Sequence, residues 1–582
     1  MTIRMKHLAL ALALLPAVAM AEGPSAAKGG MPYNNVTDAR LQNPEARNWL
    51  SWRGNYGSWT YSPLDKINDK NVSKMQMAWS YSTGVTEGHQ SPPIVNDGYM
   101  FLTTPQNQVI ALNAKTGQEI WRFKKEIPAE LFQLHPTNRG VALYGDKVYV
   151  ATTDCYLIAL DAKTGKQLWA TQIENWKTGY YMTLAPLAAK GKIMVGVSGG
   201  EYGVRGFVAG VDAETGKMAW RRHTIAAPGE MGGDTWPDNG SYKTGGGSVW
   251  VTGTYDAKTN TAYWGTGNPG PWTPDLRQGD NLFASSTLAL DVNTGEIKGY
   301  HQYAHNDSWD WDEVTPPMLF DTNIKGKKTP VAVRAGRNGY MWVLERTSTG
   351  ALKYVNAWPY VGNNVFKSLD PKTGRPEYDM SKKPSMAQGA AFCPSLWGGK
   401  DWLPEAYSPK TGLVYTMANE NMCSELPKGE ATTYKAGDLF IGFPLEGVLT
   451  NVRLTEGAKD HIGEIQAWDP STGKKVWTQK FKDQVWTPTF VTGGNLVFAG
   501  GTPDRKFRAF DAKNGKQLWE YNAPSGVIGV PASYEVDGEQ YIAVAAGWGV
   551  DAQRLAGAID HVKGTNTIVP QGGTLMVFKV PK

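Results

Sequence analysis

A short motif recurs along this chain of 582 residues and constrains its fold more than any other feature. The pattern A-x-D-x-x-T-G-x-x-x-W, in which an Asp or Asn stands eight residues before a Trp, occurs with small variations at residues 113–121, 161–169, 212–220, 469–477 and 511–519. Each copy predicts a strand that ends at the Asp or Asn, a tight turn in which Gly supplies a positive φ, and a returning strand that ends in an aromatic residue. The Trp can pack between neighbouring copies.

The spacing of the copies predicts the architecture. Trp residues of adjacent copies lie 42 to 51 residues apart, which matches one four-stranded propeller blade. Degenerate copies are read at residues 256–264, 291–300 and 408–415. With allowance for longer insertions, residues 45–582 predict an all-β, eight-bladed β-propeller with tryptophan-docking repeats, although the alternating strands alone would support seven blades nearly as well. Residues 573–580 are strand-like and could close the ring against the first blade.

Composition agrees with this fold class and excludes others. Apolar residues make up 41% and charged residues 19%, so a large core is feasible and disorder is not expected. The 66 Gly, 35 Pro and 23 Trp suit short strands joined by many turns and argue against an all-helical chain. The net charge of +5 is small and no basic run occurs, which argues against nucleic-acid binding.

The first 21 residues read as a secretory signal peptide. Arg4 and Lys6 precede an apolar stretch at residues 8–18, and residues 19–21 (Ala-Met-Ala) form a cleavage site. This stretch is too short to span a bilayer, and no later segment reaches 18 apolar residues. We therefore expect residues 22–582 to form a single propeller domain that is exported and soluble.

Three cysteines remain for chemistry or cross-linking. Cys155, Cys393 and Cys423 form neither a C-x-x-C pair nor the C-x-x-C-H motif of covalent c-type haem attachment. In an exported chain Cys393 and Cys423 could form a disulfide, which would leave Cys155 as a buried apolar side chain. The sequence leaves this pairing open.

Two insertions carry residues that the repeat itself does not require. In residues 198–201 a Gly pair would let a flat ligand approach the backbone, and Glu201 offers a carboxylate to a hard cation. In residues 265–272 a Gly/Pro frame holds the amide of Asn268. A plain structural turn explains the first insertion better than a binding site does, and it explains the second equally well.

A third insertion, at residues 305–312, is more specific. Asp310 and Asp312 would project from the same side of a locally extended chain. Two carboxylates so close are unfavourable unless a cation lies between them, which indicates a metal site. The alternative is a solvated acidic loop, which the interleaved Trp309 and Trp311 argue against.

These insertions, set in Trp-rich repeats, resemble the pyrroloquinoline quinone (PQQ)-dependent alcohol dehydrogenases of the methanol/ethanol dehydrogenase family. The resemblance runs from Trp52-Arg53-Gly54 to Gln571-Gly572-Gly573, nearly the whole chain after the signal. It implies that Trp250 stacks on the quinone and that Arg139 pairs with a cofactor carboxylate. The other cofactor-binding residues that it implies are Gln90, Thr183, Ser198, Gly199, Gly200, Ser248, Arg337 and Trp486.

The same resemblance implies the chemistry. The metal ligands would be Glu201, Asn268 and Asp310, and the metal would act as a Lewis acid on the quinone carbonyl. Asp310 would accept the alcohol proton as hydride moves to the quinone, and Arg337 would stabilise the charge that develops on the carbonyl oxygen. Electrons would pass to a soluble cytochrome c, the location would be periplasmic, and a homodimer is common among relatives.

Asp312 bears on the identity of the metal. Calcium-using relatives carry a small uncharged residue two positions after the catalytic Asp, whereas lanthanide-using relatives carry Asp. The residue at this position therefore resembles the lanthanide type, with Asp312 as a fourth metal ligand. Alternatives are that Asp312 only forms a salt bridge, and that the protein is a calcium-dependent quinoprotein dehydrogenase of another alcohol or a sugar alcohol.

Two other classes of protein share some of these sequence features. A non-catalytic propeller scaffold of the outer-membrane assembly type would need a lipidation cysteine after the signal, and residues 22–30 contain none. A membrane-bound quinoprotein sugar dehydrogenase would carry several membrane-spanning segments near its N-terminus, whereas the predicted signal peptide is the one apolar segment expected here.

Three departures from the family pattern involve four positions. Gln133 and Leu134 stand where many relatives have adjacent cysteines against the quinone, so Leu134 or His135 is expected to cover that face. Gln90 replaces a glutamate and Leu403 an asparagine. These departures bear on cofactor affinity and substrate shape, since no metal ligand, base or stacking ring is lost.

Overall fold

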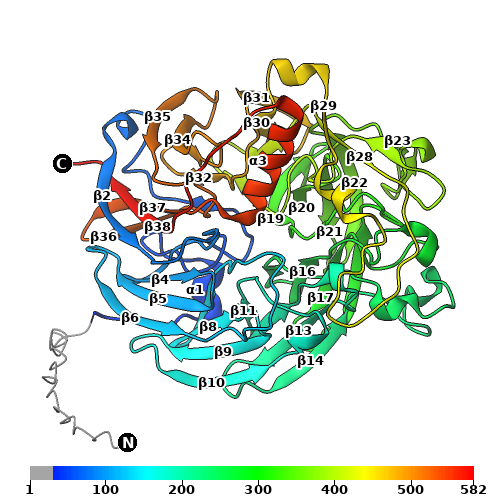
Figure 1. Ribbon diagram of the computed structural model, residues 1–582. Helices are drawn as coiled ribbons and strands as arrows, with labels where there is room; N and C mark the ends of the chain where they lie inside the picture. The colour runs from blue at the N-terminus through cyan, green and yellow to red at the C-terminus, as the bar shows by residue number, and fades with distance from the viewer. Residues whose placement is uncertain (1–30) are drawn as a thin grey trace, which may run out of the picture.

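The structure is a computed structural model that describes residues 31–582, so the predicted signal peptide lies outside the described residues. Antiparallel sheets stand around a central axis, and the chain passes from one sheet to the next around the ring (Figure 1). Among the described residues, seven of the ten sheets consist of four strands, and in five of these the strands follow one another in sequence. The fold is therefore an all-β propeller, as the repeat predicted.

The sheets around the axis, in hydrogen-bonded order, are β2(Gln76–Ser82)–β38(Thr574–Lys579)–β37(Glu539–Ala546)–β36(Ala532–Val536); β3(Ile94–Asn96)–β4(Tyr99–Thr104)–β5(Gln108–Asn113)–β6(Glu119–Lys124); β7(Val141–Tyr144)–β8(Lys147–Ala151)–β9(Tyr156–Asp161)–β10(Gln167–Gln172); β11(Leu187–Ala189)–β12(Lys192–Gly196)–β13(Phe207–Asp212)–β14(Met218–His223); β15(Thr254–Asp256)–β16(Thr261–Gly265)–β17(Ser286–Asp291)–β18(Ile297–Gln302); β19(Met318–Ile324)–β20(Lys327–Ala335)–β21(Tyr340–Arg346)–β22(Leu352–Pro359); β26(Ala406–Tyr407)–β27(Val414–Asn419)–β30(Gly463–Asp469)–β31(Lys474–Phe481); and β1(Tyr61–Ser62)–β32(Phe490–Thr492)–β33(Leu496–Ala499)–β34(Lys506–Asp511)–β35(Gln517–Asn522). Smaller sheets and helices are β23(Phe366–Leu369)–β24(Pro376–Tyr378), β25(Ala390–Phe392)–β28(Met422–Leu426)–β29(Val452–Leu454), α1(Asp38–Gln42), α2(Leu445–Leu449) and α3(Gly549–Lys563).

The repeated Trp docks on the turn of the next copy. Trp121 in β6 donates its indole N–H to the carbonyl of Ala162 at 3.0 Å. Its ring covers Gly165, where an added Cβ would lie 2.6 Å from the indole, and Gly165 has φ +71°. Asp161 closes the same turn by accepting from the backbone N–H of Thr164 at 2.8 Å. The motif therefore encodes both the turn and the surface on which the preceding sheet packs.

Two of the three degenerate copies were misassigned. Residues 291–300 span β17 and β18, the third and fourth strands of their sheet, like the regular copies. Residues 256–264 span β15 and β16, and residues 408–415 span β26 and β27, which are the first two strands of their sheets. The Asp-to-aromatic spacing arises there from a different hairpin, so these two segments are not docking repeats.

The ring is closed by strands from both ends of the chain. β38 lies between β2 and β37, with Trp79 of β2 opposite Val577 of β38. Trp519 of β35 donates to the carbonyl of Met75, directly before β2, at 3.0 Å. The prediction that residues 573–580 close the ring is confirmed.

Two of the three cysteines are paired. Cys393 and Cys423 form a disulfide, and Cys155 is a buried free thiol.

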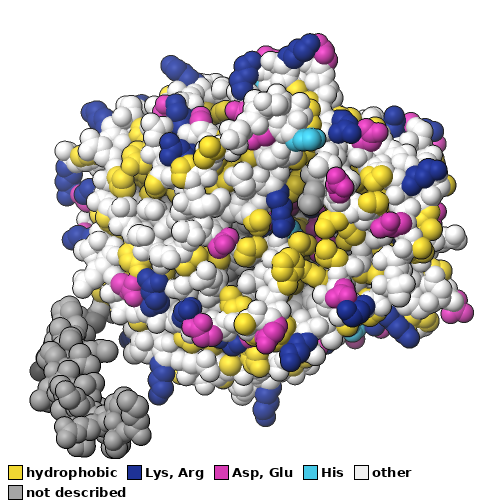
Figure 2. All heavy atoms as spheres, viewed as in Figure 1, with side chains coloured by type: hydrophobic (Ala, Val, Ile, Leu, Met, Phe, Trp, Pro, Cys, Tyr) yellow, Lys and Arg dark blue, Asp and Glu magenta, His cyan; other side chains and the backbone are white. Residues whose placement is uncertain are grey.

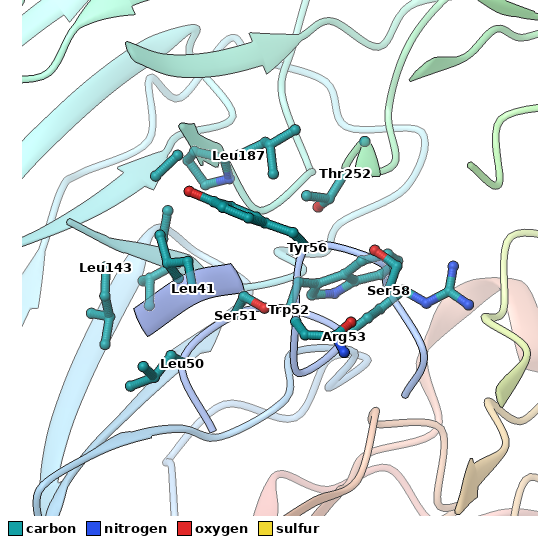
Figure 3. Close-up of a pocket in the computed structure, with 16 residues that line it drawn as sticks. Leu41, Leu50, Ser51, Trp52, Arg53, Tyr56, Ser58, Leu143, Leu187 and Thr252 are labelled. Atoms are coloured by element: carbon teal, nitrogen blue, oxygen red, sulfur yellow. The ribbon is translucent and has the colours of Figure 1, made fainter. Parts of the chain in front are cut away.

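Among residues 31–582, no helix is long and apolar enough to cross a membrane. A small cavity of about 30 Å³ lies under the segment that contains Trp52 and Tyr56, and it holds none of the predicted site residues (Figure 3).

Candidate active site

One cavity of about 310 Å³ brings most of the predicted site residues together. Helix α3 lies on the face viewed, above its centre (Figure 1), and Figure 2 shows hydrophobic side chains near the centre of the same face. The predicted residues that line the cavity are Arg139, Thr183, Ser198, Gly199, Glu201, Ser248, Trp250, Asp310, Asp312, Arg337 and Trp486. Gln90, Gly200 and Asn268 do not line it, although all three are buried.

The acidic loop is curled, so the predicted locally extended chain at Asp310 and Asp312 was wrong. Asp310 has a left-handed backbone with φ +60°, and the N–H of Asp312 donates to the carbonyl of Asp310 at 3.0 Å. The carboxylate of Asp307 accepts from the backbone N–H groups of Trp309 at 3.2 Å and Trp311 at 3.3 Å, which holds the curl. Asp310 and Asp312 nevertheless line the same cavity.

The two tryptophans of this loop anchor it. The rings of Trp309 and Trp311 are fully buried and stack with centroids 5.0 Å apart. Their indole N–H groups donate to the carbonyls of Lys382 at 2.7 Å and Ser395 at 3.0 Å. A non-glycine residue in the left-handed region is strained, so such anchoring is required to keep Asp310 in place.

Arg337 faces several carboxylates. It lies 3.4 Å from Asp310, 3.7 Å from Asp312 and 3.4 Å from Asp401. Burial raises the pKa of Asp310 well above its ordinary value, and it raises the pKa of Asp312 to about 7, although Arg337 opposes both shifts. Glu201 adds further negative charge to the same region and raises both pKa values. A cation at this position would favour the charged forms.

Asp312 is held by partners from two other loops. One carboxylate oxygen accepts from the backbone N–H of Asn268 at 2.7 Å, and the other accepts from the indole N–H of Trp250 at 3.0 Å. The side-chain amide of Asn268 lies 3.0 Å from Asp312 and 2.9 Å from the indole nitrogen of Trp272. In one orientation of this amide, its NH₂ group donates to Asp312. In the other orientation, its oxygen faces the carboxylate of Asp312, which is the arrangement expected when both oxygens bind the same cation.

The donor set is suited to a hard cation. Glu201, Asp310 and Asp312 supply carboxylate oxygens and Asn268 an amide oxygen, the ligand types that such ions prefer. Within residues 31–582, however, no three His, Cys, Asp or Glu side chains converge to hold a metal alone. An ion here would therefore need Asn268 or a bound cofactor among its ligands.

Arg139 is a buried cation that makes no ion-pair contact with a carboxylate of the described residues, although Asp551 and Asp401 act on its charge from farther away. Arg139 is only 2% exposed, and no carboxylate oxygen of the described chain lies within 4.0 Å of its guanidinium nitrogens. It donates to Thr183 at 2.6 Å and to the carbonyl of Trp250 at 3.2 Å, while its Nε–H has no partner. The guanidinium also lies over the rings of Trp250 and Trp402, at 4.7 and 4.6 Å. Burial lowers its pKa to about 10, and an anionic ligand would offset that cost.

Comparison with known proteins identifies the family. The model for the β-propeller domain of PQQ-dependent glucose/ethanol/alcohol dehydrogenases matches residues 49–356 and 479–542, more than half of the chain. The chain belongs to this family. It is 38% identical to the quinoprotein alcohol dehydrogenase PedH of Pseudomonas putida, over 90% of this chain and 89% of the relative. It is 33% identical to the 1-butanol dehydrogenase (quinone) of Thauera butanivorans, over 90% of each.

A solved structure agrees with this assignment. A europium-containing methanol dehydrogenase superposes with a TM-score of 0.86 at 35% identity, and the match covers 93% of this chain and 99% of that one. The protein is thus a PQQ-dependent alcohol dehydrogenase, an oxidoreductase, and the scaffold alternative is set aside. The buried Arg139 without an ion-pair partner and the oxygen-rich donor set fit an anionic quinone and a metal ion.

Several residues of the dehydrogenase cavity were not predicted from the sequence. Asp401 contacts Arg337, and Trp402 contacts Arg139. Both lie outside the repeats, and this was the signal in the sequence that could have indicated a functional role. Leu134 and His135, which were expected beside the quinone from the sequence, do line the cavity, while Leu403 is buried away from it. Further lining residues from outside the repeats are Phe132, Tyr181, Trp272, Leu396, Trp397, Leu439, Ile441, Leu445, Val448, Asp551 and Arg554.

Arg277 links the two loops that carry the predicted ligands. It is fully buried and donates to the carbonyls of Pro271 at 2.5 Å and Trp272 at 2.9 Å in the loop of Asn268. It also donates to the carbonyl of Asp307 in the acidic loop. Because all three acceptors are backbone carbonyls, no pattern of side chains in the sequence could have revealed this link.

Proposed function

We propose that this PQQ-dependent alcohol dehydrogenase oxidises primary alcohols to aldehydes with a lanthanide ion as Lewis acid, and that Asp312 selects the metal. The observation that carries the proposal is the position of Asp312 beside Asp310 in the cavity, in contact with Asn268. A trivalent ion needs more negative charge from its ligands than calcium does, and a further carboxylate supplies it. The contact of 3.7 Å with Arg337 is the salt bridge that the alternative invokes, and it is longer than either hydrogen bond of Asp312.

The roles of the residues follow from their positions. When bound, PQQ would supply a quinone able to accept hydride, and a metal ion held by Glu201, Asn268, Asp310 and Asp312 would supply a Lewis acid. Asp310 accepts the hydroxyl proton of the alcohol, and Arg337, fixed among three carboxylates, donates hydrogen bonds to developing negative charge. Trp250, whose indole is fixed by Asp312, provides the stacking surface, and Arg139 pairs with a cofactor carboxylate.

The substrate is proposed from the lining of the cavity. Trp397, Leu439, Ile441 and Leu445 give part of its wall an apolar character. This wall favours alcohols with an apolar chain over polyols, whose additional hydroxyl groups would be buried without partners. A calcium-dependent dehydrogenase of a sugar alcohol is the second candidate.

The remaining proposals concern the whole protein. We propose eight blades, formed by residues 22–582 as a single domain after removal of the signal peptide, and the eight larger sheets around the axis support this count. The location is the periplasm, the electron acceptor is a soluble cytochrome c, and the protein forms a homodimer. Analogy to the family supports each of these proposals.

Asp312→Asn tests the central role. The amide keeps the shape and can still accept one of the two hydrogen bonds, but it removes the charge. We expect lanthanum affinity of the PQQ-loaded protein to fall about 10- to 100-fold, by the loss of about 1.5–3 kcal/mol for a charged contact, while calcium affinity changes less. Titration with either ion, followed through the PQQ absorbance, measures this.

Asp401→Asn is the matched control. It removes another carboxylate from Arg337, at 3.4 Å, without changing a proposed metal ligand. It should leave the ratio of lanthanum to calcium affinity unchanged. An equal effect of Asp312→Asn on both ions would show that Asp312 acts only as a salt-bridge partner.

A further inference from the structure

The loop between β6 and β7 forms one wall of the active-site cavity. It has no regular secondary structure from residue 125 to residue 140, and Phe132 at its tip is 68% exposed. Residues 127–136 make two polar contacts with other parts of the described chain, and both contacts are to α3. Asp551 lies 2.7 Å from the Nδ1 of His135, and Arg554 donates to the carbonyl of Leu134 at 3.2 Å.

Helix α3 is the fixed partner in this contact. Its first residue, Gly549, packs so closely on Gly88 that a Cβ added to Gly88 would lie 2.8 Å from the Cα of Gly549. Leu555 and Ile559 are buried, in the same apolar cluster as Trp486. The helix therefore has a packed base, whereas the loop depends on side chains of the helix for its position.

The contact is charged and lies at the cavity. Leu134, His135, Asp551 and Arg554 line the same cavity as Arg139 and Trp250. Asp551 is 8% exposed and lies between His135 and Arg554, the latter at 3.6 Å. Burial alone would lower the pKa of His135, but the charge and hydrogen bond of Asp551 raise it, and Glu201 acts in the same direction. The protonated imidazole is thus favoured beside the carboxylate.

We infer that His135, Asp551 and Arg554 form a clasp that holds the 127–136 loop against α3 and thereby retains the quinone in the cavity. The inference rests on the proposed function, because it requires PQQ to occupy this cavity. The three residues are positioning residues, since they act by holding a wall of the site. Loss of Asp551 would remove the ion pair and leave two cationic side chains without their partner, which favours opening of the loop.

The rate of cofactor release tests the clasp. The holoenzyme, loaded with PQQ and lanthanum, is diluted into a large excess of an apoprotein acceptor, and PQQ release is followed by absorbance. We expect Asp551→Asn to accelerate release about tenfold, which corresponds to about 1.4 kcal/mol. Hydrogen exchange of the amides in residues 127–136 should accelerate in the same variant, while exchange within the β-sheets stays unchanged.

Two further variants keep the test decisive. His135→Ala breaks the ion pair from the loop side, where the ring is about one-third exposed, and should accelerate release like Asp551→Asn. Lys563→Ala removes a comparable ion pair, of 3.1 Å to Asp483, at the far end of the same helix, and should not change release. Release at the wild-type rate in both clasp variants would overturn the inference. Failure of the wild-type protein to bind PQQ would instead contradict the proposed function.

Discussion

At the scale of single residues, Arg139 illustrates how an arginine that binds a ligand differs from an arginine that stabilises the fold. A buried guanidinium without a carboxylate partner is a cost to the ligand-free protein. We expect Arg139→Met to leave the melting temperature of the ligand-free protein unchanged or raised. The same change should weaken PQQ binding about 10- to 100-fold, since hydrogen bonds to a charged group contribute about 1.5–3 kcal/mol.

Thermal unfolding and calorimetric titration with PQQ measure the two effects of Arg139→Met. Arg334→Met serves as the matched control, because Arg334 is equally buried but pairs with Glu313. That variant should destabilise the ligand-free protein. If Arg139→Met also destabilises it while PQQ affinity is unchanged, Arg139 is structural.

From the sequence, the residues that share the cavity could be named more reliably than the local backbone conformation. Asp310, Asp312 and Arg337 were identified from the sequence, and all three line one cavity. The expected extended backbone at Asp310 was wrong, because the carboxylate of Asp307 accepts two backbone N–H groups and curls the loop. Side-chain capping of this kind depends on the fold around it, so the spacing of the acidic residues could not reveal it.

At the scale of elements, the Trp-on-Gly contact predicts a measurable difference between two glycines. Gly165 and Gly145 both lie in turns with positive φ, +71° and +61°. A Cβ at Gly165 would clash with Trp121, whereas nothing lies within 4 Å of a Cβ at Gly145. We expect Gly165→Ala to be more destabilising than Gly145→Ala by about 1–3 kcal/mol, the usual cost of overpacking.

Urea unfolding of the two variants, followed by tryptophan fluorescence, measures this difference. Gly145→Ala is the control for the backbone cost of a positive φ, which both substitutions share. Equal shifts of the unfolding midpoint would mean that the docking contact between sheets contributes nothing measurable.

The repeat correctly predicted the hairpins in which the Trp packs on the turn of the next copy. It was misleading where a similar Asp-to-aromatic spacing occurs in a different hairpin. Residues 256–264 and 408–415 form the first hairpin of their sheets, although their sequences resemble the docking motif. Helix α3 was not predicted at all, because it is an insertion between β37 and β38. Its contact with the 127–136 loop joins residues more than 400 positions apart, which no local pattern encodes.

At the scale of the whole molecule, the propeller brings distant insertions to one place. β38 joins β2 and closes the ring, so the segments around Arg139, Trp250, Asp310 and Asp551 face one cavity. Ring closure was predicted from the strand-like residues 573–580, because a propeller needs a strand that joins its last sheet to its first. The pairing of Cys393 with Cys423 was left open because it depends on how two loops meet outside the repeats.

The metal preference of the complete enzyme tests the account most directly. Metal-free wild-type protein is reconstituted with PQQ and either lanthanum or calcium, and dye-linked oxidation is measured with ethanol, 1-butanol and a sugar alcohol. We predict activity with lanthanum and the apolar primary alcohols, and little or none with calcium. Full activity with calcium alone would contradict the assignment of Asp312 as the residue that selects a lanthanide.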